Sequence, residues 1–406
     1  MEKTIASIDV GTTKVCTLVG EVNELGVLRI VGVGVSPSRG LRKGIVVNAT
    51  EAADAIAASV ERAERISGYH ITRAFAGIAG AHISSLNSRG VVAIPRGDRG
   101  ITDEAVARAL DAAQAISIPE NYEILHVIPR GFSIDGQEGV SDPRGMNGVR
   151  LEVEAHIIVG ATPTIQNLIK CVHSLDIQVD ELVLASLASG EATLTDTERA
   201  MGVVVADIGG GTTDIAIFIE GSVWHTSVLP VGGHHLTNDV AICLRTPFEE
   251  AEEIKKKNGH ACPDQVHEDE MLDIAAFGED THQTIPRQEL ARVLHARVEE
   301  IASLILQEIK RSGYDGLLPA GVVLCGGTSR LPGIRDVAHE VIGLPVRIGR
   351  PHDLQGLVDT LTGPAYATSV GLLQWGQRQK PIVRLQPSRT SLPSRMTRWF
   401  RNLLPG

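Results

Sequence analysis

Two short segments rich in glycine and threonine repeat each other and have the residue types of phosphate-binding turns. Residues 9–14 read DVGTTK, and residues 207–214 read DIGGGTTD, 198 positions later. Each lies between two apolar runs, which predicts a turn joining two strands. Glycine lets backbone N–H groups turn toward an anion without a Cβ in the way, and threonine hydroxyls add donors. The predicted phosphate ligands are Gly11, Thr12, Thr13 and Lys14 in the first turn and Gly209, Gly210, Gly211, Thr212 and Thr213 in the second.

Each turn is preceded by an aspartate, Asp9 or Asp207. A carboxylate repels phosphate oxygens but holds hydrated Mg²⁺, so these two residues are the predicted metal ligands, acting through water. A single glycine-rich turn has an ordinary explanation as a hairpin. Two matching turns at half-chain spacing instead predict a duplicated domain that clamps one nucleotide between its halves. P-loop and Rossmann folds are excluded, because no G-x-x-x-x-G-K-[ST] occurs and no G-x-G-x-x-G opens a helix after the first strand.

A third segment, residues 320–333, reads as a buried strand, a glycine turn and a new helix. Its Gly326, Gly327 and Thr328 are expected to lie against adenosine. The three motifs, in this order, resemble the two phosphate loops and the adenosine loop of the actin-like ATPase superfamily. The resemblance implies an α/β, actin-like fold of two duplicated domains, with ATP and Mg²⁺ as its cofactors.

Composition limits the class of protein. With 406 residues and 43% apolar residues, the chain can bury two substantial cores. Its five cysteines are scattered without C-x-x-C spacing, which favours reduced thiols over disulfides or a zinc site. We expect no cleaved signal peptide and no membrane span, since the start lacks a leader pattern and no apolar run reaches 18 residues. The net charge of −11 disfavours nucleic-acid binding.

The pattern along the chain predicts how the domains are divided. Helices are expected at residues 49–67, from 103 after the cap Thr102, at 162–174 after the cap Thr162, and at 182–194, 248–258, 288–311 and 360–374, with a linker at 195–200. The predicted first domain comprises residues 1–82, 161–200 and 351–377, and the second comprises 201–230 and 301–350. The predicted remaining units are an inserted α/β subdomain at 83–160, a small nucleotide-contacting and partner-binding subdomain at 231–300, a flexible linker at 378–391 and an amphipathic helix at 392–406.

The inserted unit resembles the extra subdomain of the FtsA family of bacterial cell division proteins. The resemblance rests on SDPRGM at 141–146, RLE at 150–152, LVLASLASGE at 182–191 and LPVGG at 229–233, and it extends over essentially the whole chain. In relatives the helix around residues 251–255 contacts ribose and adenine, which implies that Glu252 and Lys255 bind nucleotide; a solvated charged helix is the alternative. Glu191 is the candidate catalytic residue that orients an attacking water, and a role on a helix surface is its alternative.

FtsA proteins are actin-like, ATP-binding membrane tethers of the tubulin-like division protein FtsZ. The resemblance therefore implies a structural adaptor with weak ATPase activity at most. It implies a peripheral protein on the cytoplasmic face of the inner membrane at the division site, which forms filaments with itself and recruits other division proteins. It also places the C-terminal peptide of FtsZ on residues 231–300.

The C-terminal segment has the pattern of a membrane-surface helix. From Arg378 onward there are seven basic residues and no acidic ones. Apolar residues recur at helical spacing among arginines, which is typical of helices that lie on anionic lipid. A terminal helix packed on its own domain is the alternative. The predicted lipid contacts are Met396, Arg398, Trp399, Phe400, Arg401 and Leu403.

Two other functions fit the same superfamily. A sugar or acid kinase would need a carboxylate base beside the attacking hydroxyl, and the sequence offers none in a recognisable position. An actin-like pilus-assembly adaptor is the second alternative. The terminal amphipathic pattern favours the FtsA family over both.

Overall fold

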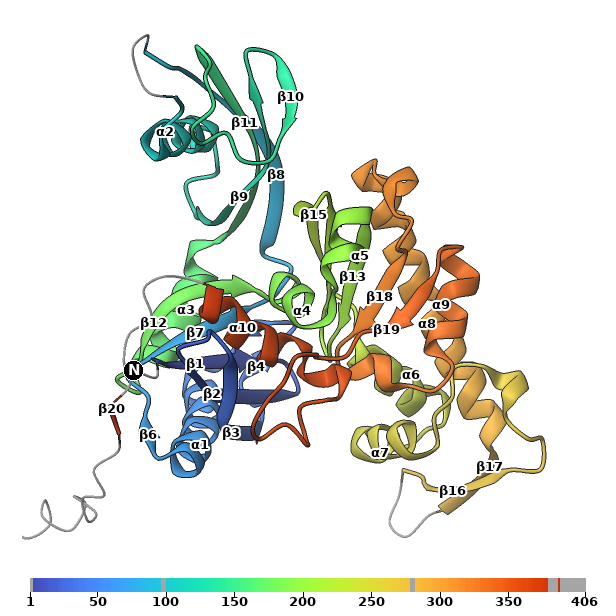
Figure 1. The fold of residues 1–406 in the computed structure, drawn as a ribbon. Coiled ribbons are helices and arrows are strands. Elements are labelled where there is room, and N and C mark those ends of the chain that lie inside the picture. Colours follow the sequence, from blue (N-terminus) through green and yellow to red (C-terminus); the bar gives the residue numbers. More distant parts are fainter. Residues whose placement is uncertain (1–2, 96–99, 278–281, 379–385, 388–406) are drawn as a thin grey trace, which may run out of the picture.

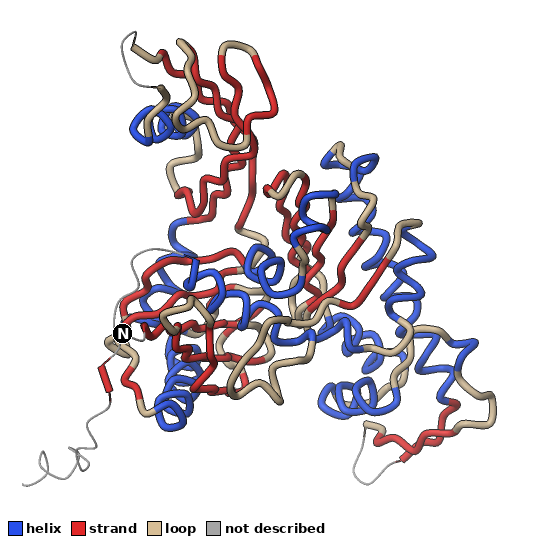
Figure 2. Tube along the Cα trace, in the orientation of Figure 1, coloured by secondary structure: helices blue, strands red, loops and turns tan. Residues whose placement is uncertain are grey.

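Two five-stranded sheets with the same strand arrangement form the body of the protein. The structure, a computed structural model, describes residues 3–95, 100–277, 282–378 and 386–387 (Figures 1 and 2). The first sheet has the order β3-β2-β1-β7-β12 and the second has the order β15-β14-β13-β18-β19. The first comprises β1 (Lys3–Val10), β2 (Lys14–Val22), β3 (Leu28–Pro37), β7 (Arg73–Ile78) and β12 (Gln178–Leu184). The second comprises β13 (Val203–Ile208), β14 (Thr213–Ile219), β15 (Ser222–Leu229), β18 (Val322–Cys325) and β19 (Val346–Ile348).

The central strands β1 and β13 occupy equivalent positions. Each pairs antiparallel with the strand that follows it and parallel with a strand from later in the chain. Asp9 and Asp207 are the next-to-last residues of these two strands, so each glycine-rich turn leaves its sheet at the same place. All six residues of β13 are buried, as expected of a strand with both faces of its sheet covered. The predicted duplication is confirmed.

Helices cover the sheets and cross between the halves. The helix α1 (Ala49–Ser67) has the predicted bounds, with Asn48 as its N-cap and a buried stripe from Ala52 to Ala63. The other helices of the body are α3 (Thr162–His173), α4 (Ala185–Thr193), α5 (Asp196–Met201), α8 (Arg287–Ser312), α9 (Ile334–Ile342) and α10 (Ala367–Arg378).

The helices α4 and α10 pack closely against each other beside the junction of the two sheets. All nine residues of α4 are buried. A Cβ at Gly371 would overlap the backbone oxygen of Ala188, and one at Gly190 would approach the ring of Phe218 in β14 to 2.7 Å. Glycine at both positions therefore lets α4 lie against α10 on one side and against the second sheet on the other.

The inserted unit stands away from the rest of the molecule, at the top of Figure 1. It contains β8 (Ile83–Ala93), α2 (Asp103–Gln114), β9 (Tyr122–Ile134), β10 (Gln137–Val140) and β11 (Arg150–Ala161). The sheet order is β10-β9-β11-β8, and α2 packs against β8 and β11. Its hydrophobic cluster is separate from those of the two sheets and includes Leu151, Val153 and Ile157.

A small subdomain extends from the second half, at the lower right of Figure 1. It consists of α6 (Gly233–Cys243), α7 (Phe248–Asn258) and a hairpin of β16 (Met271–Ala275) with β17 (His282–Pro286), followed by α8. The bounds of α7 are those predicted. Short pairs complete the structure: β4 (Leu41–Arg42) with β5 (Ile45–Val46), and β6 (Tyr69–His70) with β20 (Gln386–Pro387).

Several predicted elements were wrong. Residues 182–184 end strand β12 and are not helical, because they pair parallel with β7. The predicted linker 195–200 is mostly helix α5, which a capping box of Thr195 and Glu198 begins. The cap of α3 is Ala161 and not Thr162, and α10 begins at Ala367 after a 3₁₀ turn (Pro364–Tyr366).

The C-terminal predictions fall mainly outside the described residues. These are the amphipathic helix at 392–406, with its six lipid contacts, and most of the linker at 378–391. Among the residues that the structure does describe, no helix combines the length and apolar composition needed to cross a membrane.

Candidate nucleotide-binding cleft

A cavity of about 450 Å³ lies between the two halves, and both glycine-rich turns open into it. Its walls come from the ends of β1 and β13, from α6 and α7 of the small subdomain, and from the start of α10. Most of the predicted nucleotide ligands line it: Asp9, Gly11, Thr12, Thr13, Lys14, Asp207, Gly209, Gly210, Thr212, Glu252, Lys255, Gly326, Gly327 and Thr328. The structure thus brings together predicted residues from four separate parts of the sequence.

The two turns have the same backbone hydrogen bond. Gly11 N–H donates to the Lys14 carbonyl at 3.0 Å, and Gly209 N–H donates to the Thr212 carbonyl at 2.9 Å. The turns face each other closely, because a Cβ at Gly210 would overlap the Thr13 hydroxyl. Glycine is therefore required there for the two halves to meet.

The two aspartates at the base of the cleft are held by hydroxyl groups. Ser369 donates to Oδ2 of Asp9 at 2.5 Å, and Thr368 donates to Oδ2 of Asp207 at 2.7 Å. Ser189 of α4 also donates to Oδ2 of Asp207. Burial raises the pKa of Asp207, and the hydroxyl hydrogen bonds partly oppose that rise.

The predicted adenosine loop lies directly beside Asp207. Gly326 has a φ of 84°, and a Cβ there would overlap Oδ1 of that aspartate. The Thr328 hydroxyl donates to the Gly209 carbonyl at 2.9 Å, which joins this loop to the second phosphate turn. The new helix expected after the loop is α9, which begins at Ile334 after a 3₁₀ turn (Gly327–Arg330).

Helix α7 brings an ion pair to the opposite wall. Lys255 Nζ lies 2.6 Å from Glu252 Oε2 and 2.7 Å from the Thr237 hydroxyl of α6. Burial would raise the pKa of Glu252, but hydrogen bonds from Lys255 and Thr237 outweigh it and lower that pKa to about 2. The pair is partly buried and lines the cleft, which argues against the alternative of a purely solvated helix.

Sequence reasoning missed Asp214, which closes the second motif. Its side chain lines the cleft, accepts a hydrogen bond from Thr212 at 2.8 Å through Oδ2, and has no partner at Oδ1 among the described residues. Burial and the neighbouring Asp207 raise its pKa to about 8. Its position as the last residue of the motif at 207–214 is the sequence signal that could have identified it. His234, Tyr366 and Thr368 also line the cleft without a comparable sequence signal.

Three predicted residues do not line the cleft. A Cβ at Gly211 would meet Lys43 of the first half at 2.9 Å, so this glycine serves the contact between halves. Thr213 is fully buried and donates to the Val231 carbonyl at 2.9 Å. The predicted catalytic role of Glu191 does not fit its position. Its buried carboxylate lies 3.0 Å from Arg199 Nη1 and 2.6 Å from Arg378 Nη1, so it is not positioned to orient water at a phosphate.

These residues fit a nucleotide with a hydrated divalent cation. The two turns use glycine at positions where a Cβ would meet neighbouring atoms, and their backbone N–H groups can serve as donors to phosphate. Lys14 adds a positive charge near the first turn. Two carboxylates at the base of the cleft suit a metal bound through water. When bound, the cation would neutralise phosphate charge, and Asp9 and Asp207 would hold its water molecules.

Comparison with known proteins agrees with this arrangement. A family model described as "Cell division protein FtsA" matches residues 204–371, and one described as "SHS2 domain inserted in FTSA" matches residues 80–159. The chain is 44% identical to the cell division protein FtsA of Pseudomonas aeruginosa over 409 residues, covering 98% of each chain. The chain belongs to the FtsA family. It is also 35% identical to FtsA of Escherichia coli K12 over 412 residues, again covering 98% of each chain.

Solved structures place this FtsA-family fold among actin-like proteins. The PilM-PilN type IV pilus biogenesis complex contains a chain with a TM-score of 0.68 at 14% identity, covering 92% of this chain and 99% of that one. MreB5 of Spiroplasma citri bound to ADP has a TM-score of 0.56 at 13% identity, covering 93% and 98%. The predicted actin-like fold is confirmed, and membership of the FtsA family gives the chain a role in cell division.

Proposed function

We propose that this protein binds ATP-Mg²⁺ in the cleft, polymerises on the cytoplasmic face of the inner membrane at the division site, and tethers the FtsZ ring to that membrane. The observation that carries the proposal is the meeting of two equivalent Asp-Gly-Thr turns, one from each half, around a single cavity. Adenosine would lie between the loop at Gly326 and the Glu252–Lys255 pair, because both line the same cavity.

We expect the protein to hydrolyse ATP slowly at most. Asp214 replaces Glu191 as the residue proposed to orient a water molecule, since its Oδ1 is buried, without a partner among the described residues, and on the cleft wall. Family membership favours the adaptor over the sugar or acid kinase and over the pilus-assembly adaptor.

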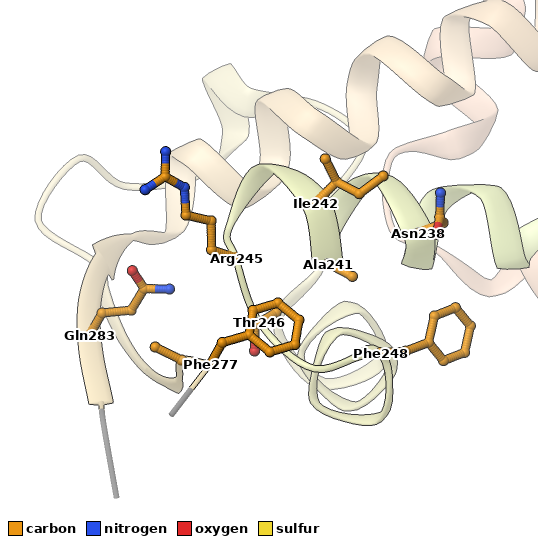
Figure 3. A pocket seen from close by; sticks show the side chains of 9 residues that line it. Asn238, Ala241, Ile242, Arg245, Thr246, Phe248, Phe277 and Gln283 are labelled. Carbon is orange, nitrogen blue, oxygen red and sulfur yellow. The ribbon is translucent and has the colours of Figure 1, made fainter. Parts of the chain in front are cut away.

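The C-terminal peptide of FtsZ is proposed to bind the outer side of the small subdomain. A pocket of about 530 Å³ lies there between α6, the start of α7 and the β16–β17 hairpin (Figure 3). Ile242 and Phe248 line it with 66% and 40% of their surfaces exposed, and Arg245 adds a positive charge at its edge. Exposed apolar side chains around a cationic group suit a short peptide with apolar anchors and a terminal carboxylate.

Attachment to lipid is assigned to the C-terminal segment, outside the described residues. Burying four apolar side chains of one helix in lipid would contribute roughly 1.5 to 3 kcal/mol of binding free energy from each side chain. The loss of conformational entropy on ordering the helix would oppose this by about 1 kcal/mol or more per residue. Single chains would therefore bind weakly, and a filament carrying many such helices would bind firmly.

Sedimentation with anionic liposomes tests the proposal as a whole. The full chain is mixed with liposomes, with or without ATP-Mg²⁺ and the FtsZ peptide, and the pelleted protein is measured. We expect ATP to increase the pelleted fraction and the peptide to pellet with the protein. Phosphorylation of an added sugar, with no binding to liposomes, would support the kinase instead.

A further inference from the structure

Two neighbouring residues at the start of α10 contact the carboxylates of both halves. The Thr368 hydroxyl donates to Asp207 of the second sheet at 2.7 Å, and the Ser369 hydroxyl donates to Asp9 of the first sheet at 2.5 Å. Successive residues of a helix point about 100° apart, so one helix end can reach two separate groups. One peptide unit thus links the two aspartates at the base of the cleft.

The surrounding contacts fix the position of this helix end. Ser7 of β1 donates to the Ser369 carbonyl at 3.3 Å, which ties α10 to the strand that carries Asp9. The Thr368 hydroxyl also lies 3.0 Å from the Ser189 hydroxyl of α4, and Ser189 itself donates to Asp207. Ser7, Ser189 and Ser369 are fully buried. The positions of these three serine hydroxyls are therefore set by packing and not by solvent.

The three hydrogen bonds that the aspartates accept from Ser189, Thr368 and Ser369 all reach Oδ2. Within the described part of the chain, no donor contacts Oδ1 of either one. A hydrogen bond to one oxygen of a carboxylate orients the group and leaves the other oxygen for a metal or its water. Each half therefore contributes one aspartate with an oxygen outside these hydrogen bonds, and both aspartates line the same cavity.

We propose that Thr368 and Ser369 are positioning residues, which set the spacing and orientation of Asp9 and Asp207 for one hydrated divalent cation. This inference rests on the proposed binding of ATP-Mg²⁺. Because Thr368 belongs with the first sheet and Asp207 with the second, the cation-binding geometry depends on how the two halves sit against each other. Closure of the halves and retention of the cation are then linked through α10.

The test compares nucleotide binding in the presence and absence of the metal. A fluorescent ATP analogue is titrated into the full chain at a series of Mg²⁺ concentrations and in EDTA. For Thr368→Val and Ser369→Ala we expect the Mg²⁺ concentration for half-maximal binding to rise about tenfold or more, as with other groups that orient metal ligands. Affinity in EDTA should change less than about twofold. Thr368→Ser should restore the Mg²⁺ dependence of the parent.

Ser36→Ala is the matched control, because it removes a buried hydroxyl of the first half that donates to the Ala55 carbonyl of α1 and to no carboxylate. It should leave the Mg²⁺ dependence unchanged. An unchanged Mg²⁺ dependence in both test variants would overturn the positioning role while leaving nucleotide binding intact. Equal losses in EDTA and in Mg²⁺, shared by Ser36→Ala, would show a structural role only. Failure of the parent to bind the analogue at all would overturn the proposed function as well.

Discussion

Nε2 of His126 accepts a hydrogen bond from the backbone N–H of Leu184 at 3.2 Å, joining the base of the inserted subdomain to the first sheet. The ring is buried, lies edge-on to Trp375, and has Nδ1 3.7 Å from Glu181. Protonation at Nε2 would destroy this bond, since both groups would then be donors. A second buried histidine, His156, makes the equivalent connection to the second half through the Thr226 hydroxyl at 3.0 Å.

Acid is expected to loosen the inserted subdomain. Burial lowers the pKa of His126 to about 4, and burial with the nearby His225 and Arg130 lowers that of His156 to about 3. In both histidines the folded-state pKa lies below the unfolded-state pKa of about 6.5. The stability that each neutral histidine contributes is therefore fully present above about pH 6.5 and is lost as the pH falls. From pH 7.5 to 5.0 each histidine should reduce the free energy of unfolding by about 2 kcal/mol.

Denaturant titrations of the parent and of His126→Gln and His156→Gln at pH 7.5 and pH 5.0 measure this effect. Each variant should be less stable than the parent at pH 7.5 but lose less on acidification. His267→Gln changes an exposed histidine and should keep the parent's pH dependence. The same acid-induced loss in all four proteins would show that other groups are responsible.

Arg130 should also hold the inserted subdomain in place. Its guanidinium lies 4.1 Å from the centre of the Trp224 ring and 5.6 Å from that of Tyr314, both in the second half. A cation over an aromatic ring contributes about 0.5 to 2 kcal/mol, depending on burial. Arg130→Ala should therefore make the subdomain junction more sensitive to protease. Arg144→Ala is the control, because its ion pairs with Asp103 and Asp142 lie within the subdomain; equal sensitivity in the two variants would argue against the junction contact.

A charge in the outer pocket of the small subdomain should weaken peptide binding. Ile242→Glu is expected to reduce the affinity for the C-terminal peptide of FtsZ tenfold or more, measured by fluorescence anisotropy, since it places a carboxylate on the apolar wall. Ile66→Glu is the control, because it alters another exposed isoleucine, 56% accessible, on α1 of the first half. If both variants bound the peptide like the parent, the peptide site would have to lie elsewhere.

A charge in the apolar face of the C-terminal segment should release the protein from lipid. Trp399→Glu is expected to abolish sedimentation with anionic liposomes, because burying a carboxylate in the acyl region is costly. Nucleotide binding should be unchanged, since the cleft is formed by other residues. Thr397→Ala is the control within the same segment. Undiminished sedimentation of Trp399→Glu would mean that the segment packs on the protein itself.

The sequence predicted those parts of the fold that depend on local patterns. Helix α1 has the predicted bounds, because its apolar positions repeat at helical spacing. The glycine-threonine turns were identifiable because few other folds require those residues between two strands. The capping box at Thr195 and Glu198 was also visible but was overlooked.

The errors involve contacts between distant residues. Residues 182–184 are a strand because β7, about a hundred residues earlier, pairs with them. Glu191 is held by Arg378, far along the chain, and no local pattern marks that pair. The positions of Thr368 and Ser369 likewise depend on how α10 packs between the two sheets, which spacing alone does not specify.

The central claim is that one ATP-Mg²⁺ binds between the two glycine turns, and calorimetric titration of the full chain tests it most directly. The parent should bind one ATP per chain, more tightly with Mg²⁺ than in EDTA. Gly210→Val should lose this binding, because its side chain would occupy the space of the Thr13 hydroxyl. Gly131→Val, at a position where an added Cβ would meet no atom within 4 Å apart from its chain neighbours, should bind like the parent. Unchanged affinity in a folded Gly210→Val protein would contradict the account.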